Sequence, residues 1–257
     1  MTAIVGSVVV GLGAGVLAGV FGIGGGVLTT PAVRLLLGYP ALVAVGTPLL
    51  ALIPGAVAGA AMHVRSGEAN VRTGLVVGAW GALSAAVGAR GSAAAGGTAV
   101  MLVTAVVIVW GAISILRRPP TEAVVGITSV PAAVGRRPVA VAVTGIATGL
   151  YSGFLGLGGG VVLVPILHRF FGYSMKAAVG TSLVAISVLA VPGALMHWWL
   201  GHVDLMLAVG LGVGAVPGAV IGARLAGAAS DRGLRTGFAV LLGTIGVVLA
   251  LTELGAR

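Results

Sequence analysis

The sequence GVFGIGGGV at residues 19–27 recurs as GFLGLGGGV at residues 153–161. A shift of 134 residues aligns residues 18–90 with residues 152–224 without a gap, and 27 of these 73 positions are identical. The identities include Pro31, Tyr39, His63 and Arg90, which matching Gly and Ala content alone does not explain. The chain is therefore an internal duplication, and each half is expected to fold as one unit.

The composition predicts an all-α integral membrane protein. Of the 257 residues, 58% are hydrophobic and only 7% are charged, whereas soluble domains carry about 25% charged residues. The apolar runs are long and continuous, which favours membrane helices. The net charge of +9 sits at the ends of these runs and forms no basic stripe, so the expected partner is the lipid bilayer and not nucleic acid.

Each half divides into four long apolar segments and one short segment. The ranges are 3–21, 27–37 (short), 41–62, 71–90 and 98–116 in the first half, and 138–155, 161–171 (short), 175–200, 204–228 and 234–252 in the second. Residues 117–137 form a polar linker. We therefore expect a membrane repeat at 1–116, a linker at 117–137 and a second membrane repeat at 138–257.

The short segments determine the topology. Eleven helical residues span about 17 Å, against a hydrocarbon core of about 30 Å. If each short segment changes sides, giving ten crossings, one face collects 11 of the 14 Lys and Arg residues; eight crossings give 7 on each face. The positive-inside rule favours inverted repeats with a cytoplasmic linker, although eight crossings remain an alternative. Membrane repeats of this kind are typical of secondary transporters.

The two glycine loops are candidate anion sites. A helix is expected to begin after each loop, and helix starts present unpaired N–H groups that bind anions without a charged side chain. The candidate residues are Gly24, Gly25, Gly26, Gly158, Gly159 and Gly160. The alternative is close helix packing, which we prefer for Gly11, Gly15 and Gly19, spaced four apart.

Hydroxyl groups inside the second long segment of each half, at 41–62 and 175–200, extend this candidate site. Thr47, Thr181 and Ser182 lie about six residues into their helices and can donate hydrogen bonds to an oxyanion. The alternative is that they bond to their own helix backbone. No carboxylate lies in the middle of an apolar segment, which argues against a cation site.

Three further residues are candidates for gating or anion entry: Arg34, His63 and His197. Each lies near a segment end, where anchoring at the membrane interface is the alternative role. The spacing of His197, His202 and Asp204 fits no established metal motif, so no metal is expected. The sequence shows no nucleophile–base pair and no cysteine, so we expect neither an enzyme nor a cofactor.

The motifs of the second half resemble those of the sulfite exporter TauE/SafE family. They are GFLGLGGG at 153–160, Pro165, Gly172-Tyr173 and AVGTS at 178–182, and the resemblance covers nearly the whole chain. It implies a plasma-membrane permease for sulfite, sulfonates or related organic anions, coupled to an ion gradient. Pro48 replaces the family serine in the first half, so the halves are expected to contribute unequally.

The prediction from the sequence is a secondary transporter of small anions that works by alternating access. A passive anion channel and a non-transporting membrane scaffold are the alternatives.

Overall fold

Every described part of the chain supports the all-α class. The computed structural model describes residues 2–116 and 138–255, so the predicted linker at 117–137 lies outside the described residues. Within these two ranges there are ten helices and no strand. Eight of the helices are long and apolar enough to cross a membrane. The chain is a multi-pass membrane protein.

The helices follow the predicted segments in both halves. The first half contains α1 (Thr2–Phe21), α2 (Gly26–Leu35), α3 (Ala41–Arg65), α4 (Val71–Ala95) and α5 (Gly97–Leu116). The second contains α7 (Pro138–Leu155), α8 (Gly160–Phe170), α9 (Met175–Trp199), α10 (Leu205–Ala228) and α11 (Asp231–Gly255). The short helices α2 and α8 have 10 and 11 residues, which reach only about 15–17 Å.

Glycine rows bring helices of opposite halves into direct backbone contact. A Cβ on Gly15 of α1 would lie 2.8 Å from the Cα of Ala215 in α10, and a Cβ on Gly153 of α7 would lie 2.8 Å from the carbonyl carbon of Ala85 in α4. The expectation that the glycines four apart in α1 serve helix packing is confirmed. Small residues are the usual means of close approach in lipid, where apolar burial gives little drive for association.

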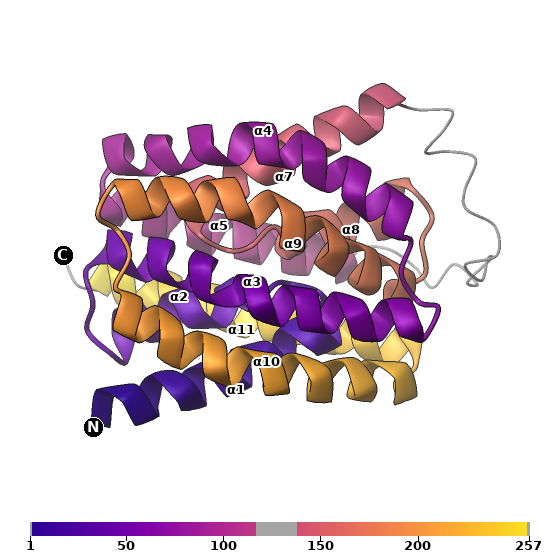
Figure 1. The fold of residues 1–257 in the computed structure, drawn as a ribbon, viewed down its shortest axis with the longest axis horizontal. Helices are drawn as coiled ribbons and strands as arrows, with labels where there is room; N and C mark the ends of the chain where they lie inside the picture. The colour runs from indigo at the N-terminus through magenta and orange to yellow at the C-terminus, as the bar shows by residue number, and fades with distance from the viewer. Residues whose placement is uncertain (1, 117–137, 256–257) are drawn as a thin grey trace.

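The central pair, α3 and α9, runs antiparallel. Gly59 of α3 contacts Leu183 of α9, whereas Leu49 near the start of α3 contacts Gly193 towards the end of α9. In Figure 1 this pair lies between α4 with α7 on the upper side and α1 with α10 on the lower side. These two helices, which correspond in the alignment of the halves, therefore point in opposite directions.

Large apolar side chains cover the outer surface. Val9, Leu83, Val143, Val213 and Leu251 are all exposed, from five different helices. In water such a surface would be an aggregation hazard, but in a bilayer it contacts the acyl chains. This surface encloses an interior in which the glycine loops lie.

Candidate functional site

The two glycine loops lie side by side in the interior of the protein. Residues 22–25 join α1 to α2, residues 156–159 join α7 to α8, and all of them are buried. The pairs in contact are Gly22 with Gly160, Gly24 with Gly158, and Gly26 with Gly156. The loops therefore run in opposite directions and pass each other at Gly24 and Gly158, where a Cβ on Gly24 would lie 3.5 Å from the Gly158 Cα.

Glycine is required at the two positions that start the short helices. Gly25 has φ 76° and Gly159 has φ 104°, in the left-handed range that other residues rarely adopt. Neither position has a side-chain cap on the helix that follows. The first N–H groups of α2 and α8 thus have no partner within their own helix, and each start carries the positive end of a helix dipole.

A tyrosine makes the start of α8 differ from the start of α2. The Tyr151 hydroxyl of α7 donates a hydrogen bond to the Gly159 carbonyl oxygen and accepts one from the Val162 N–H at 3.3 Å. The equivalent position in the first half is Leu17, which cannot bond in this way. One of the first N–H groups of α8 is therefore held by a side chain, and the two helix starts are chemically unequal.

Aliphatic side chains at equivalent positions cover the loops. Leu52 of α3 places Cδ2 2.7 Å from where a Cβ on Gly25 would lie. Ile186 of α9 places Cγ1 3.5 Å from where a Cβ on Gly159 would lie. The sequence predicted uncovered amide groups, whereas the structure has them beneath these two side chains.

The predicted hydroxyls of Thr47 and Thr181 join the two halves. Thr47 Oγ1 accepts the Asp204 N–H at 3.0 Å, and Thr181 Oγ1 accepts the Asn70 N–H at 3.0 Å. Each bond runs from a central helix of one half to the N-cap of a helix in the other. Gly180, which precedes Thr181, has no side chain, so the backbone before Asn70 can approach α9 closely. The sequence motif Ala-Val-Gly-Thr thus has a role in holding the halves together.

Ser182 is the predicted hydroxyl that contacts a glycine loop. Its Oγ lies 2.8 Å from the carbonyl oxygen of Gly22 and equally far from that of Val179. In the first half Pro48 has no hydroxyl, and the corresponding loop residue Gly156 packs directly on Val45. The serine therefore links α9 to the loop at residues 22–25.

Three buried hydroxyls that the sequence did not single out have no partner among the described residues: Thr30 on α2, and Thr148 and Ser152 on α7. The Thr148 methyl group lies 3.1 Å from where a Cβ on Gly159 would be, so this residue is beside the second loop. Their equivalents are Val164, Ala14 and Ala18. Comparison of the two halves therefore could not identify these three hydroxyls from the sequence.

His63 and His197 are buried inside the protein, in the last turns of α3 and α9. Their Nε2 atoms lie 3.0 and 2.8 Å from the carbonyl oxygens of Gly19 and Gly153, in the last turns of α1 and α7. The other ring nitrogen of His197 faces His202, whose pKa is lowered by burial. Both histidines are thus placed to respond when the ends of α1 and α7 move.

Arg34 lies at the opposite end of α2 from the glycine loop. Its Nη1 donates a hydrogen bond to the Tyr39 carbonyl oxygen at 3.3 Å. His168 occupies the equivalent place on α8 and contacts the Tyr173 carbonyl oxygen at 2.8 Å. Both side chains close the connection that follows the short helix, so Arg34 belongs to the outer part of the molecule.

Comparisons with known proteins agree with this architecture. The family model described as Sulfite exporter TauE/SafE matches residues 7–249. Relatives in Bacillus subtilis (strain 168) include probable membrane transporter protein YdhB, 29% identical over 82% of this chain and 85% of the relative. Another is probable membrane transporter protein YunE, 28% identical over 94% of this chain and 93% of the relative. A probable membrane transporter protein of Xylella fastidiosa (strain 9a5c) is 27% identical over 86% of this chain and 85% of the relative.

No solved structure matches the chain. The family match covers nearly all of both halves, including both glycine loops. The chain belongs to the sulfite exporter TauE/SafE family of membrane transporters.

Proposed function

We propose that the protein is a secondary transporter of small anions across the plasma membrane, with sulfite and sulfonates as the main substrate class and other organic anions as close candidates. One observation carries this proposal: two helices start at buried glycine loops, and the N-cap residue of each is a glycine without a capping side chain. Such helix starts attract anions. The family membership supports the same substrate class.

The chemistry of the loops suits an oxyanion. A sulfite or sulfonate group presents oxygens that accept hydrogen bonds, and the proposed donors are backbone N–H groups of Gly24–Gly26 and Gly158–Gly160 with the Ser182 hydroxyl. Of the described acidic residues, Glu68 lies in a connection, Asp204 and Asp231 lie at helix starts, and Glu253 lies in the last turn of α11. None of them lies within the glycine loops, where a carboxylate would repel an anion.

Because two of the unpaired hydroxyls belong to α7, we propose that the second half contributes more to the anion site than the first half. Thr148 and Ser152 lie on α7 and have no partner among the described residues. A buried hydroxyl without a partner costs about 1–3 kcal/mol, a cost that a bound oxyanion would remove. We place the anion at the start of α8, with Thr148 and Ser152 as donors, and keep Thr47 and Thr181 as predicted neighbours of the site.

Alternating access follows from the two-fold arrangement that we infer. Corresponding central helices run antiparallel, and the glycine loops run in opposite directions. Leu52 and Ile186 cover the loops from equivalent positions, so each can act as the cover on one side of an inverted repeat. His63 and His197 would sense the opening of each side, and Arg34 would attract anions at one entrance.

The buried state of the loops favours a carrier over a passive channel. Every residue of the loops 22–25 and 156–159 is enclosed, so transport requires side chains to move in each cycle. A channel passes ions through an open path without such a cycle.

Reconstitution in liposomes tests the proposal. Flux of methanesulfonate and of sulfite should saturate with concentration and should fall at least about tenfold in Thr148→Val, a loss of about 1.4 kcal/mol in transition-state stabilisation. Thr104→Val is the matched control, because that hydroxyl bonds to Val100 of its own helix. Linear, voltage-driven current would support a channel, and absence of both binding and flux for these anions would contradict the proposed substrate class.

A further inference from the structure

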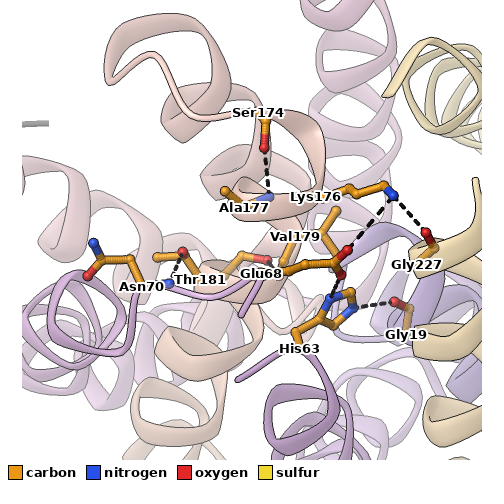
Figure 2. Close-up of polar contacts among 11 residues, drawn as sticks. Gly19, His63, Glu68, Asn70, Ser174, Lys176, Ala177, Val179, Thr181 and Gly227 are labelled. Atoms are coloured by element: carbon orange, nitrogen blue, oxygen red, sulfur yellow. Dashed lines mark hydrogen bonds and ion pairs between the residues drawn. The ribbon is translucent and has the colours of Figure 1, made fainter. Parts of the chain in front are cut away.

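A polar cluster lies at one end of α3, near the first glycine loop, with His63 buried and its partners Glu68 and Lys176 partly exposed (Figure 2). His63 places Nε2 3.0 Å from the carbonyl oxygen of Gly19, three residues before the loop at 22–25, and Nδ1 3.1 Å from Oε2 of Glu68. Lys176 at the start of α9 lies 3.8 Å from Oε1 of Glu68 and donates to the Gly227 carbonyl oxygen at 2.7 Å. We call His63, Glu68 and Lys176 the His63 cluster.

Each ring nitrogen of His63 makes a contact that needs a proton. That proton lies either on the nitrogen or on the atom that the nitrogen faces. A backbone carbonyl only accepts hydrogen bonds, so Nε2 carries a proton that it donates to Gly19. The contact between Nδ1 and Glu68 also needs a proton, because an unprotonated nitrogen and a carboxylate are both acceptors. The pair therefore holds one proton more than a neutral imidazole and a carboxylate do separately.

The equivalent place in the second half needs no extra proton. His197 donates from Nε2 to the Gly153 carbonyl oxygen, and its Nδ1 lies 3.3 Å from Nδ1 of His202. A neutral His202 can donate to a neutral His197, so both contacts are satisfied without added charge. The two halves share the backbone arrangement and differ in their capacity for a proton.

We propose that the His63–Glu68 pair is a proton-binding site whose occupancy holds this end of the transporter closed. The inference rests on the proposed transport function for its purpose, although the site itself is defined by the contacts. Release of the proton to the adjacent solution leaves two acceptors facing each other at 3.1 Å. Their repulsion separates His63 from Glu68 and frees the end of α1 that leads into the glycine loop.

Charged groups on the surrounding helices set the background for this site. Lys176 faces Glu68 directly, and Asp231 accepts the neighbouring Met175 N–H at 3.2 Å. The remaining charged residues at this end of the helices are Arg65 on α3, Arg72 on α4, Arg169 on α8, Arg224 on α10, and Arg232 and Arg235 on α11. The pair therefore lies in cationic surroundings, and the proton that His63 and Glu68 share is the mobile one.

The proton is taken up from, and released to, the solution at this end of the molecule. Opening at this end would then depend on the pH of the solution that it faces. The second half lacks the carboxylate, so its end should open without this dependence.

Spin-label distances test the site without any substrate, and the absence of cysteine makes paired labels straightforward. Labels at Ser66→Cys and Ala228→Cys report the end beside the His63 cluster. Labels at the equivalent positions Leu200→Cys and Ala94→Cys report the other end. Between pH 5 and 8 the first pair should show a separated population that rises by up to about tenfold per pH unit, the limit for release of one proton, whereas the second pair stays constant.

The variant Glu68→Gln removes the mobile proton but keeps a donor for Nδ1. The first label pair should then stay at its short distance at every pH. The proposal is overturned if the distance between the first pair of labels does not change with pH in the protein with the native His63 cluster. It is also overturned if that distance still depends on pH in Glu68→Gln. If Glu68→Gln does not fold, His202→Glu places a carboxylate opposite His197 and should make the second label pair pH-dependent; no change there also overturns it.

Flux measured with methanesulfonate, whose charge is constant over this pH range, separates this inference from the proposed function. A pH-dependent distance without flux retains the proton site and rejects the substrate class. If methanesulfonate flux is observed but the distance between the first pair of labels does not depend on pH, the transport proposal stands and the proton site is rejected.

Discussion

The contact between the two glycine loops makes Gly26→Ala a sharp test of the fold. Gly26 is the first residue of α2 and has no positive φ, so alanine carries no backbone strain there. A Cβ at this position would lie 2.6 Å from the Gly156 carbonyl oxygen and 2.7 Å from the Leu157 Cα. Ordinary contact begins at 3.4 Å, so the backbone of the second loop must retreat by about 0.7–0.8 Å.

Two opposing effects set the size of the change. Alanine is favoured over glycine inside a helix by about 1 kcal/mol. Overpacking typically costs about 1–3 kcal/mol and exceeds this range when it displaces backbone. Both loops have to shift here, so we expect a net loss of about 2 kcal/mol or more.

Gly243→Ala in α11 is the matched control. It lies within a helix, and no atom is found within 4 Å of the added Cβ. We expect this variant to be as stable as the native protein, or more stable by up to about 1 kcal/mol. The free energy of unfolding of both variants is measured in detergent micelles with chemical denaturant. Equal stabilities for Gly26→Ala and Gly243→Ala would refute the loop contact.

Three other changes have expected outcomes of different kinds. Thr148→Val removes a buried hydroxyl without a partner among the described residues, so thermal unfolding should show unchanged or higher stability, while Thr104→Val should lose about 1 kcal/mol. A loss of stability in Thr148→Val would mean that its hydroxyl is already bonded. Thr181→Val leaves the buried Asn70 N–H without an acceptor, which should cost about 1–3 kcal/mol in the free energy of unfolding; Thr181→Ser should restore most of it. Burial lowers the pKa of His202 below its ordinary 6.5, so the unfolded chain binds more protons and stability should fall as the pH drops through about 6.5. The slope of unfolding free energy against pH should decrease in His202→Gln, and an unchanged slope would assign it to another group.

The helices were largely predictable because the apolar runs and glycines are local signals. The predicted segment 41–62 becomes α3 (Ala41–Arg65), and 234–252 becomes α11 (Asp231–Gly255). Both helices extend past the apolar run because charged or polar residues at the membrane surface still complete the last helical turns. Hydropathy locates the part of a helix that lies in lipid and not its last residue.

The candidate site was predictable only in part. The repeat located the glycine loops and the Thr47 and Thr181 positions, but it could not show that each threonine binds a backbone N–H of the other half. Leu52 and Ile186 belong to ordinary apolar runs, so their position over the loops emerges only from the packing. Pairing across the halves is a long-range property that hydropathy and spacing do not encode.

The comparison of equivalent positions separates structural roles from functional ones. Contacts that hold the molecule together occur twice, as in the pairing of His63 and His197 with the carbonyl oxygens before each loop. Groups that we propose to bind the anion or the proton occur once: Thr148 stands opposite Ala14, and Glu68 opposite His202. Divergence at these positions, within a retained pairing of helices, is where we propose that the two halves have acquired different functions.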